Sequence, residues 1–274
     1  MVLGQMSNPL AIASTWDNVA FDYAEVTAPF FANFAEKALN AVSLERGSRV
    51  IDIAAGPGTL ALLAAERGHV VTAVDFSPAM IGELNARAQA KTLRVETHVA
   101  DGQQLPIADN SQNAAFSMFG LIFFPDRAKG FAEMLRVLSP GGFGVVSCWQ
   151  PMERFPMLAE VFVALQRLLP NMPFGAGRAP LGEPQAIIEE MNTAGFKDVS
   201  VLEVSASSEA PTLELAWNFM LRGSAPFALL RRNIGEAAWQ NVESGIVDQL
   251  RSKYGSGAQR VTMSAYLGLG RKNH

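Results

Sequence analysis

The sequence has few of the residues that disulfide, metal or nucleic-acid chemistry requires. Its 274 residues include a single cysteine, Cys148, which cannot form a disulfide within the chain, and only three histidines, His69, His98 and His274. Lys and Arg number 22 against 26 Asp and Glu, and the charges are mixed along the chain, so the basic patch of a phosphate-binding protein is missing. We therefore expect no structural metal and no nucleic-acid partner.

Long hydrophobic runs are also missing. No stretch of about 18 apolar residues occurs, so we expect no membrane-spanning helix. The start of the sequence, MVLGQMSNPL, lacks the basic segment and long apolar core of a signal peptide. We expect a cytoplasmic protein, and the sequence does not indicate its oligomeric state.

Short apolar runs alternate with helical patterns through the middle of the chain. Strands are expected at 50–54, 70–74, 93–99, 114–118, 143–149, 198–204 and 260–269. Helices are expected between the first five of these strands at 59–67, 78–90 and 127–138. Strands of four to seven residues separated by helices predict βαβ units. The expected fold is therefore α/β, a Rossmann-like, doubly wound, mostly parallel sheet of seven strands.

Helical additions surround this core in the expected single domain, residues 1–274. A lead-in comprises residues 1–45, in which Pro29 should divide a helical run into two helices, and the cofactor-binding core comprises 46–150. The turn Ser139–Gly142 is expected to separate the last core helix from the fifth strand. Segments 151–182 and 208–258 carry further helical patterns and are predicted to be insertions that cap the active site.

The most informative motif is a strand that runs into a glycine turn and opens a helix. Residues 50–59 read VIDIAAGPGT, in which Gly56 and Gly58 allow a ligand to approach the backbone and the helix amides. With Ala61, these glycines also satisfy the dinucleotide pattern GxGxxG/A, and Asp75 follows near the expected distance. The turn by itself therefore leaves a dinucleotide open.

Three acids at successive strand ends favour a different ligand. Asp52 would repel a pyrophosphate and attract an ammonium group, Asp75 is placed to accept ribose hydroxyls, and Asp101 to accept an adenine amine. Any one of them is equally compatible with a helix N-cap. Three together, at the edge where open α/β sheets bind ligands, predict an amino-acid conjugate of a nucleoside.

These motifs resemble those of the class I S-adenosylmethionine-dependent methyltransferases, especially the branch that contains ubiquinone and menaquinone biosynthesis enzymes. The resemblance covers Trp16 to Trp149 and includes motif I at 52–59, a ribose segment at 74–80 and an adenine segment at 100–106. The segment 119–126 and the turn 138–142 match two later family motifs.

The resemblance implies S-adenosyl-L-methionine as the cofactor, and it implies the residues of its site. The cofactor-binding residues expected are Tyr23, Asp52, Ala54, Gly56, Gly58, Asp75, Phe76, Met80, Asp101, Gly102, Gln103 and Phe119. Phe124 and Trp149 are expected to bind the acceptor. Many relatives carry a histidine pair where this chain has Ile122 and Phe123, so the catalytic base stays unknown.

The predicted activity is methylation of oxygen, nitrogen or carbon in a small, largely apolar acceptor, because the expected acceptor pocket is aromatic. Two alternatives remain open from the sequence. One is an NAD(P)-dependent oxidoreductase, which the acids at 52 and 101 disfavour. The other is a non-catalytic cofactor-binding protein on the same fold, since a fold does not fix a function.

Overall fold

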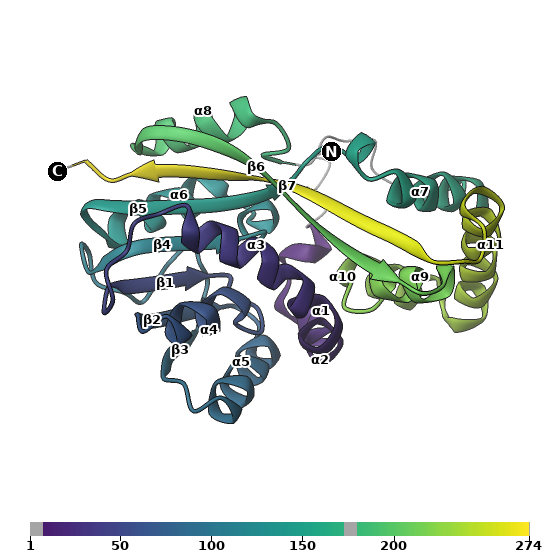
Figure 1. Cartoon of the computed structure of the whole chain (residues 1–274), viewed down its shortest axis with the longest axis horizontal. Coiled ribbons are helices and arrows are strands. Elements are labelled where there is room, and N and C mark those ends of the chain that lie inside the picture. The colour runs from purple at the N-terminus through teal and green to yellow at the C-terminus, as the bar shows by residue number, and fades with distance from the viewer. Residues whose placement is uncertain (1–7, 173–179, 274) are drawn as a thin grey trace, which may run out of the picture.

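The computed structural model describes residues 8–172 and 180–273, and its centre is one seven-stranded sheet (Figure 1). The strands lie in the order β3-β2-β1-β4-β5-β7-β6, and β7 is antiparallel to both of its neighbours. Their bounds are β1 Arg49–Ile53, β2 Val70–Asp75, β3 Val95–Val99, β4 Gln112–Met118, β5 Leu138–Trp149, β6 Lys197–Ala210 and β7 Gln259–Arg271. The predicted Rossmann-like, mostly parallel sheet is confirmed.

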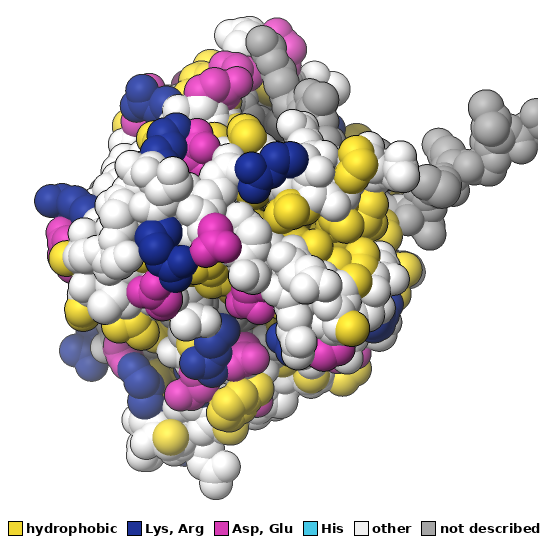
Figure 2. Space-filling model, turned by 90° about the vertical axis from the view of Figure 1, so that its right-hand side faces the viewer, with side chains coloured by type: hydrophobic (Ala, Val, Ile, Leu, Met, Phe, Trp, Pro, Cys, Tyr) yellow, Lys and Arg dark blue, Asp and Glu magenta, His cyan; other side chains and the backbone are white. Residues whose placement is uncertain are grey.

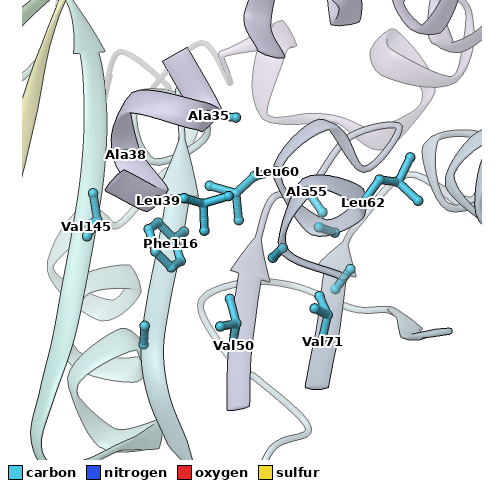
Figure 3. Packing of buried hydrophobic residues seen from close by; sticks show 14 of the residues in the cluster. Ala35, Ala38, Leu39, Val50, Ala55, Leu60, Leu62, Val71, Phe116 and Val145 are labelled. Carbon is cyan, nitrogen blue, oxygen red and sulfur yellow. The ribbon is translucent and has the colours of Figure 1, made fainter. Parts of the chain in front are cut away.

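Helices cover both faces of this sheet, which explains why its central strands β1 and β4 are buried along almost their whole length. On one face pack α3 (Ala28–Asn40), α4 (Thr59–Glu66) and α5 (Pro78–Ala90), and on the other α6 (Arg127–Val137) and α8 (Pro184–Ala194). Figure 3 shows the first layer, where Leu39 of α3 and Leu60 of α4 lie over Phe116 of β4.

The lead-in departs from the expected simple break at Pro29. Two short helices, α1 (Ala13–Asp17) and α2 (Ala20–Asp22), are followed by a π-helical turn, Tyr23–Thr27, which continues into α3. Pro29 lies in the first turn of α3, where a helix needs no amide donor. The helix boundary expected near Pro29 is therefore a π-helical turn, and such turns are frequent at functional sites.

The turn Ser139–Gly142 lies within β5 and does not precede it. Leu138 pairs with Gln112 and Phe143 pairs with Ala114, so the four residues between them loop out of the ladder. The amide of Gly141 donates to the carbonyl of Lys272, and Lys272 donates to the carbonyl of Gly142. The prediction placed the start of β5 too late because backbone pairing with the end of β7 holds the turn in the sheet.

The last two strands extend far beyond the rest of the sheet, and the predicted strands 198–204 and 260–269 were too short. β5 ends where Trp149 pairs with Ala265, but β6 and β7 continue pairing from Ser205↔Ser264 to Ala210↔Gln259. Hydroxyl pairs join the two strands, with 2.8 Å between the side chains of Ser205 and Ser264. We call this extension, residues 205–210 and 259–264, the arm.

Four helices gather around the arm and form the cap, with α7 above it and α9, α10 and α11 around its tip in Figure 1. Their bounds are α7 Pro156–Leu168, α9 Leu213–Leu221, α10 Ala225–Ile234 and α11 Glu236–Tyr254. They share a hydrophobic core that includes Val161, Leu165, Trp217, Trp239, Ile246 and Leu250. The cap therefore has its own core and is not held by loops alone.

The cap end of the molecule exposes a mixture of side chains (Figure 2). Basic and acidic residues are interspersed over the described part of that face, and hydrophobic side chains gather toward one edge. Among the described residues, no helix combines the length and hydropathy needed to cross a membrane.

Replacing Trp239 by alanine tests the independence of the cap core. Its side chain is fully buried, so we expect Trp239→Ala to lower the free energy of unfolding by about 3–5 kcal/mol. Leu215→Ala, at an exposed position of the same cap, serves as control. Chemical denaturation measures both; equal, small effects would contradict a packed cap.

Candidate active site

A cavity of about 850 Å³ lies between the carboxyl ends of the parallel strands and the cap. One end is lined by Gly56, Asp75 and Asp101. Gly56 follows β1, Asp75 is the last residue of β2, and Asp101 follows β3. The other end is walled by residues of α7, α9, α10 and the arm. The cavity is continuous, so a ligand at the strand ends and a ligand under the cap would meet in it.

The glycine turn after β1 depends on backbone angles that side chains disfavour. Gly56 and Gly58 have φ of 54° and 79°, and the non-glycine Ala54 has φ of 57°. A Cβ added at Gly58 would lie 2.4 Å from Cγ of Leu84 in α5, so only glycine lets α4 start this close to α5. The turn thereby brings the backbone of residues 54–56 to the cavity wall.

Asp75 is the buried acid at the centre of the cofactor end. Its two carboxylate oxygens accept hydrogen bonds from the amides of Gly56 at 2.8 Å and Ser77 at 2.9 Å. Burial nevertheless raises the pKa of Asp75 to about 6, and these amides oppose the rise. A carboxylate placed in this way orders the glycine turn and still faces the cavity.

Asp52 lies behind the glycine turn and does not reach the cavity. Only 1% of its surface is exposed, and its carboxylate accepts a hydrogen bond from the amide of Ala61 in α4 at 3.0 Å. Burial raises the pKa of Asp52 to about 8, with a further contribution from the charge of Asp75. The direct ligand contact expected of Asp52 is therefore not what the structure shows: the side chain faces the start of α4 behind the turn.

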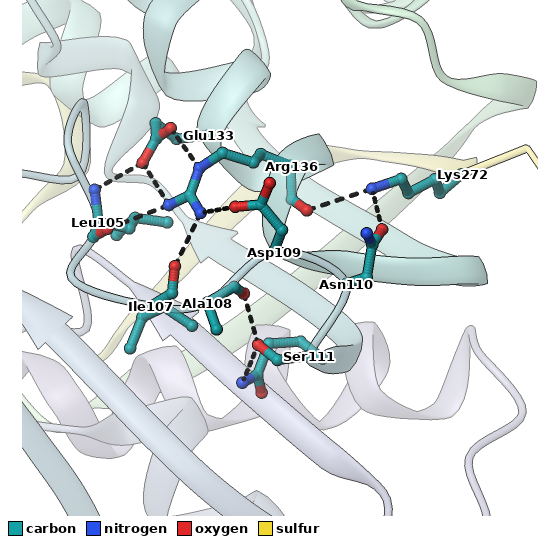
Figure 4. A network of polar contacts seen from close by, with 10 residues as sticks. Leu105, Ile107, Ala108, Asp109, Asn110, Ser111, Glu133, Arg136 and Lys272 are labelled. Atoms are coloured by element: carbon teal, nitrogen blue, oxygen red, sulfur yellow. Dashed lines mark hydrogen bonds and ion pairs between the residues drawn. The ribbon is translucent and has the colours of Figure 1, made fainter.

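The loop after β3 is fastened to α6 by one arginine (Figure 4). The guanidinium of Arg136 donates to the carbonyls of Leu105 and Ile107 and pairs with Glu133 and Asp109, and Glu133 accepts from the amide of Leu105. The side chain of Gln103 accepts from the amide of Asp126, just before α6. The Asp101–Gln103 end of the loop is held against the cavity by these contacts.

An aromatic cluster marks the middle of the cavity. The rings of Phe119 and Trp149 stack with centroids 4.0 Å apart, and the edge of Phe31 meets both. Phe119 has a φ of 59°, which is strained for a phenylalanine, and its amide donates to the side chain of Ser147. Strain held in this way fixes the ring at the carboxyl end of β4, between the two ends of the cavity.

Twelve of the fourteen predicted site residues line the cavity. They are Tyr23, Ala54, Gly56, Asp75, Phe76, Met80, Asp101, Gly102, Gln103, Phe119, Phe124 and Trp149. Asp52 and Gly58 lie behind the wall. Phe124, expected to bind the acceptor, packs against Gly102, where an added Cβ would lie 2.5 Å from its ring. It therefore lies beside the loop after β3, at the cofactor end.

The sequence did not single out much of the wall. The rings of Trp16 and Phe123 meet edge to face over the cofactor end, with their centroids 5.0 Å apart. The cap end is lined by residues of α7, α9, α10 and the arm. The cap residues include Leu158, Phe162, Leu165, Phe219, Met220, Phe227, Leu230, Val261 and Met263. The spacing of the helical residues is that of any buried helix face, and the alternation of Val261 and Met263 is that of any strand, so the sequence could not distinguish cavity from core.

The charged groups of the wall are unevenly placed. Among the described lining residues, the only carboxylates, Asp75 and Asp101, are at the cofactor end. His69 and His98 are not part of the wall, and His98 pairs with Glu96 on β3. The described residues contain no group of acids, histidines or cysteines that could hold a metal ion. Three arginines also line the wall: Arg154, Arg222 and Arg260, of which Arg222 pairs with Asp22. The acids suit the cofactor end to a cation with hydroxyl groups, and the aliphatic and aromatic side chains that dominate the cap end suit it to a largely apolar molecule.

Comparison with known proteins identifies the family. Residues 50–142 match the model of a methyltransferase domain. The demethylmenaquinone methyltransferase of Thermus thermophilus is 34% identical over 170 residues, 57% of this chain and 77% of that protein. An uncharacterised protein of Mycobacterium tuberculosis is 35% identical over 127 residues, so the match spans about half the length of either protein (46%).

Among solved structures, phosphoethanolamine N-methyltransferase 2 of Haemonchus contortus, in complex with S-adenosyl-L-methionine, shares the fold. Its TM-score is 0.59 at 20% identity, over 94% of this chain and 57% of that one. The fold and the acidic strand ends define an α/β protein of the nucleoside-cofactor class. Within that class, the chain belongs to the class I S-adenosylmethionine-dependent methyltransferase family. The family prediction and its cofactor are confirmed, and the dinucleotide alternative loses its support.

The residues at the cofactor end fit this cofactor. Two buried carboxylates, Asp52 and Asp75, carry raised pKa values because nothing cationic offsets their burial among the described residues. A sulfonium and an ammonium group would supply that positive charge. Glycine angles at the turn leave room for a ligand beside the backbone.

These pKa values predict how cofactor binding depends on pH. A cation prefers the ionised acids, so affinity should rise as pH increases through about 6 to 8, with proton release on binding. For folding without ligand the sign is opposite: because both folded pKa values exceed the unfolded value near 4, the unfolding free energy is highest below about pH 4 and falls as the pH rises to about 6 for Asp75 and about 8 for Asp52. Calorimetry from pH 5 to 9, in buffers of different ionisation enthalpy, measures how cofactor affinity and proton release depend on pH. A flat affinity profile would contradict it.

Arg136→Ala tests whether the loop after β3 must be held in place. Loss of the guanidinium frees Leu105, Ile107 and Glu133, so the loop must be ordered again when the cofactor binds, and we expect about tenfold weaker affinity. Arg251→Ala, which also removes two ion pairs but on the exposed cap surface, should leave affinity unchanged. Equal effects of the two variants on affinity would refute the role of the loop.

Proposed function

We propose that this protein transfers a methyl group from S-adenosyl-L-methionine to a small, largely apolar organic acceptor. The observation that carries the proposal is the single cavity that joins the acidic strand ends to an aromatic and aliphatic chamber under the cap. When bound, the cofactor would supply a methyl group on a sulfonium: the acceptor atom attacks the methyl carbon in line, and the C–S bond breaks as the neutral thioether leaves. Such a reaction requires alignment and exclusion of water more than acid or base groups.

We propose a division of labour among the wall residues. Asp75, Phe76 and Met80, with Asp101–Gln103, hold the cofactor, while Ala54 and Gly56 present backbone to it and Asp52 acts from behind. Tyr23 and Phe119 stand at the border of the two compartments, and Trp149 contacts the acceptor. These aromatic rings exclude water from the middle of the cavity and restrict the approach of the acceptor.

The shape of the chamber supports an extended acceptor. From Met263, near the aromatic cluster, to Gln259 at the tip, four residues of strand cover ~13 Å. Met152, Met157 and Met220 also line it, and methionine adapts to irregular apolar shapes. A quinone-like or other ring compound with an apolar extension fits such a space. The relatives named as demethylmenaquinone methyltransferases suggest demethylmenaquinone as one candidate to test.

The acceptor atom is expected to be nucleophilic on arrival. The described cap-end wall contains neither a histidine nor a carboxylate that would remove a proton during the reaction. Tyr23 is not such a base, because burial raises its pKa and it stays protonated. We therefore propose an acceptor with an acidic phenol, a thiol or an electron-rich carbon over an ordinary alcohol.

Two measurements test the proposal in order. Calorimetry with S-adenosyl-L-methionine, S-adenosyl-L-homocysteine, NAD and NADP establishes the cofactor, and mass spectrometry then seeks a 14-dalton gain in a panel of apolar phenols, quinols and thiols. Binding followed by methylation supports the proposal. Binding without methylation of any member favours the non-catalytic alternative, and preference for NAD would sink the proposal altogether.

Trp149→Ala separates acceptor positioning from cofactor binding. Its ring stacks on Phe119 and meets Phe31 and Phe155, so its loss should misplace the acceptor and reduce kcat/KM about 100-fold. Affinity for S-adenosyl-L-homocysteine should change less than threefold. Trp149→Phe, which keeps a flat ring, should recover most of the rate in a methyl-transfer assay. A loss of cofactor affinity in both variants would place Trp149 at the other end.

A further inference from the structure

The lead-in crosses the cavity as a strap, residues 8–27, and it is tied at two places. Toward the cap, Asp22 pairs with Arg222, and the hydroxyl of Thr27 donates to the carbonyl of Arg222. Toward the cofactor end, the tie is Asp17, the last residue of α1. Between the ties, Leu10, Ala11, Trp16 and Tyr23 line the cavity.

Asp17 bonds to the segment that follows the ribose-binding acid. One carboxylate oxygen accepts from the hydroxyl of Ser77 at 2.6 Å and from the amide of Ala79 at 3.2 Å. The same Ser77 hydroxyl accepts from the amide of Met80, and the Ser77 amide donates to Asp75. A chain of hydrogen bonds thus runs from α1 through Ser77 to Asp75.

We infer that Asp17 is a positioning residue for the cofactor: it caps α5 from the outside and locks the strap, with Trp16, over the cofactor end. Two features support this role. Ser77 already caps α5 through Met80, so α5 does not need Asp17 in order to begin. The other polar bonds of α1 stay within the strap, since Thr15 and Trp16 donate to the carbonyls of Pro9 and Leu10.

The placement has an electrostatic cost that a purely structural tie would avoid. Burial raises the pKa of Asp75, and the nearby charge of Asp17 raises it further. Asp52 and Tyr23 are the other titratable groups that interact with Asp75. A third acid near the cofactor end increases its attraction for a cation. The bonds that hold the strap over the cofactor end and the attraction of the acids for a cationic cofactor therefore both favour cofactor binding.

This inference rests on the proposed cofactor site, and its test uses binding of S-adenosyl-L-homocysteine. Asp17→Ala should weaken binding about tenfold and speed hydrogen exchange of strap amides, since a charge-assisted bond is lost. The affinity of Asp17→Asn should lie between those of Asp17→Ala and the wild-type protein. Because this variant removes a charge beside Asp75, the pH midpoint of binding should shift downward. Because part of the effect of Asp17 passes through Ser77, replacing Asp17 by alanine should weaken binding clearly less in a Ser77→Ala background than in the wild-type protein.

The control is Thr212→Ala, which removes the side-chain cap of α9 from the amide of Leu215, away from the cofactor end. It should lower the melting temperature and leave affinity within twofold. Wild-type affinity in Asp17→Ala, or additive effects in the double variant, would overturn the inference while the cofactor site stands. Failure of the wild-type protein to bind S-adenosyl-L-homocysteine would overturn both.

Discussion

The burial of two carboxylates at the ends of neighbouring parallel strands is the constraint around which the site is built. Asp52 and Asp75 are taken out of water, at a free-energy cost that one or two amide hydrogen bonds reduce but do not remove, as their raised pKa values show. The amides come from the glycine turn, from Ser77 and from the first turn of α4. The two buried carboxylates therefore account together for the backbone angles of the glycine turn, the position where α4 begins and the affinity for a cation.

A second consequence of the sheet is the chamber itself. Five strands end near the cofactor, but β6 and β7 continue as the arm, and the cap helices pack around it. Beyond Trp149 of β5 these two strands pair only with each other, and antiparallel pairing is the more stable kind per residue. The family sheet thus provides the cofactor end, and the length of one strand pair provides the space for the acceptor.

Local sequence predicted the core well because its elements obey simple periodicities. The helix expected at 78–90 is α5 residue for residue, capped by Ser77 and opened by Pro78. The arm was missed because its strand Ser205–Ala210 reads as polar, SASSEA, and its partner strand, Gln259–Ser264, is distant in the sequence. Asp52 was given a ligand contact because a strand-end acid looks the same in sequence whether it faces the cavity or the helix behind it. Trp16 and Asp17 gave no periodic signal, since their roles arise from where a short helix docks.

The strap makes the two ends of the cavity depend on each other. Gly223, between α9 and α10, lies so close to the π-helical turn that an added Cβ would be 2.3 Å from the Thr27 hydroxyl and 2.8 Å from Cα of Tyr23. Tyr23 in turn touches Phe31 of the aromatic cluster and faces Asp75. A shift of the cap on acceptor binding would therefore move the residue that stands between the compartments. The π-helical turn thus contacts the cap on one side and carries, in Tyr23, a side chain beside Asp75 on the other, so the order of the strap and the position of the cap depend on each other.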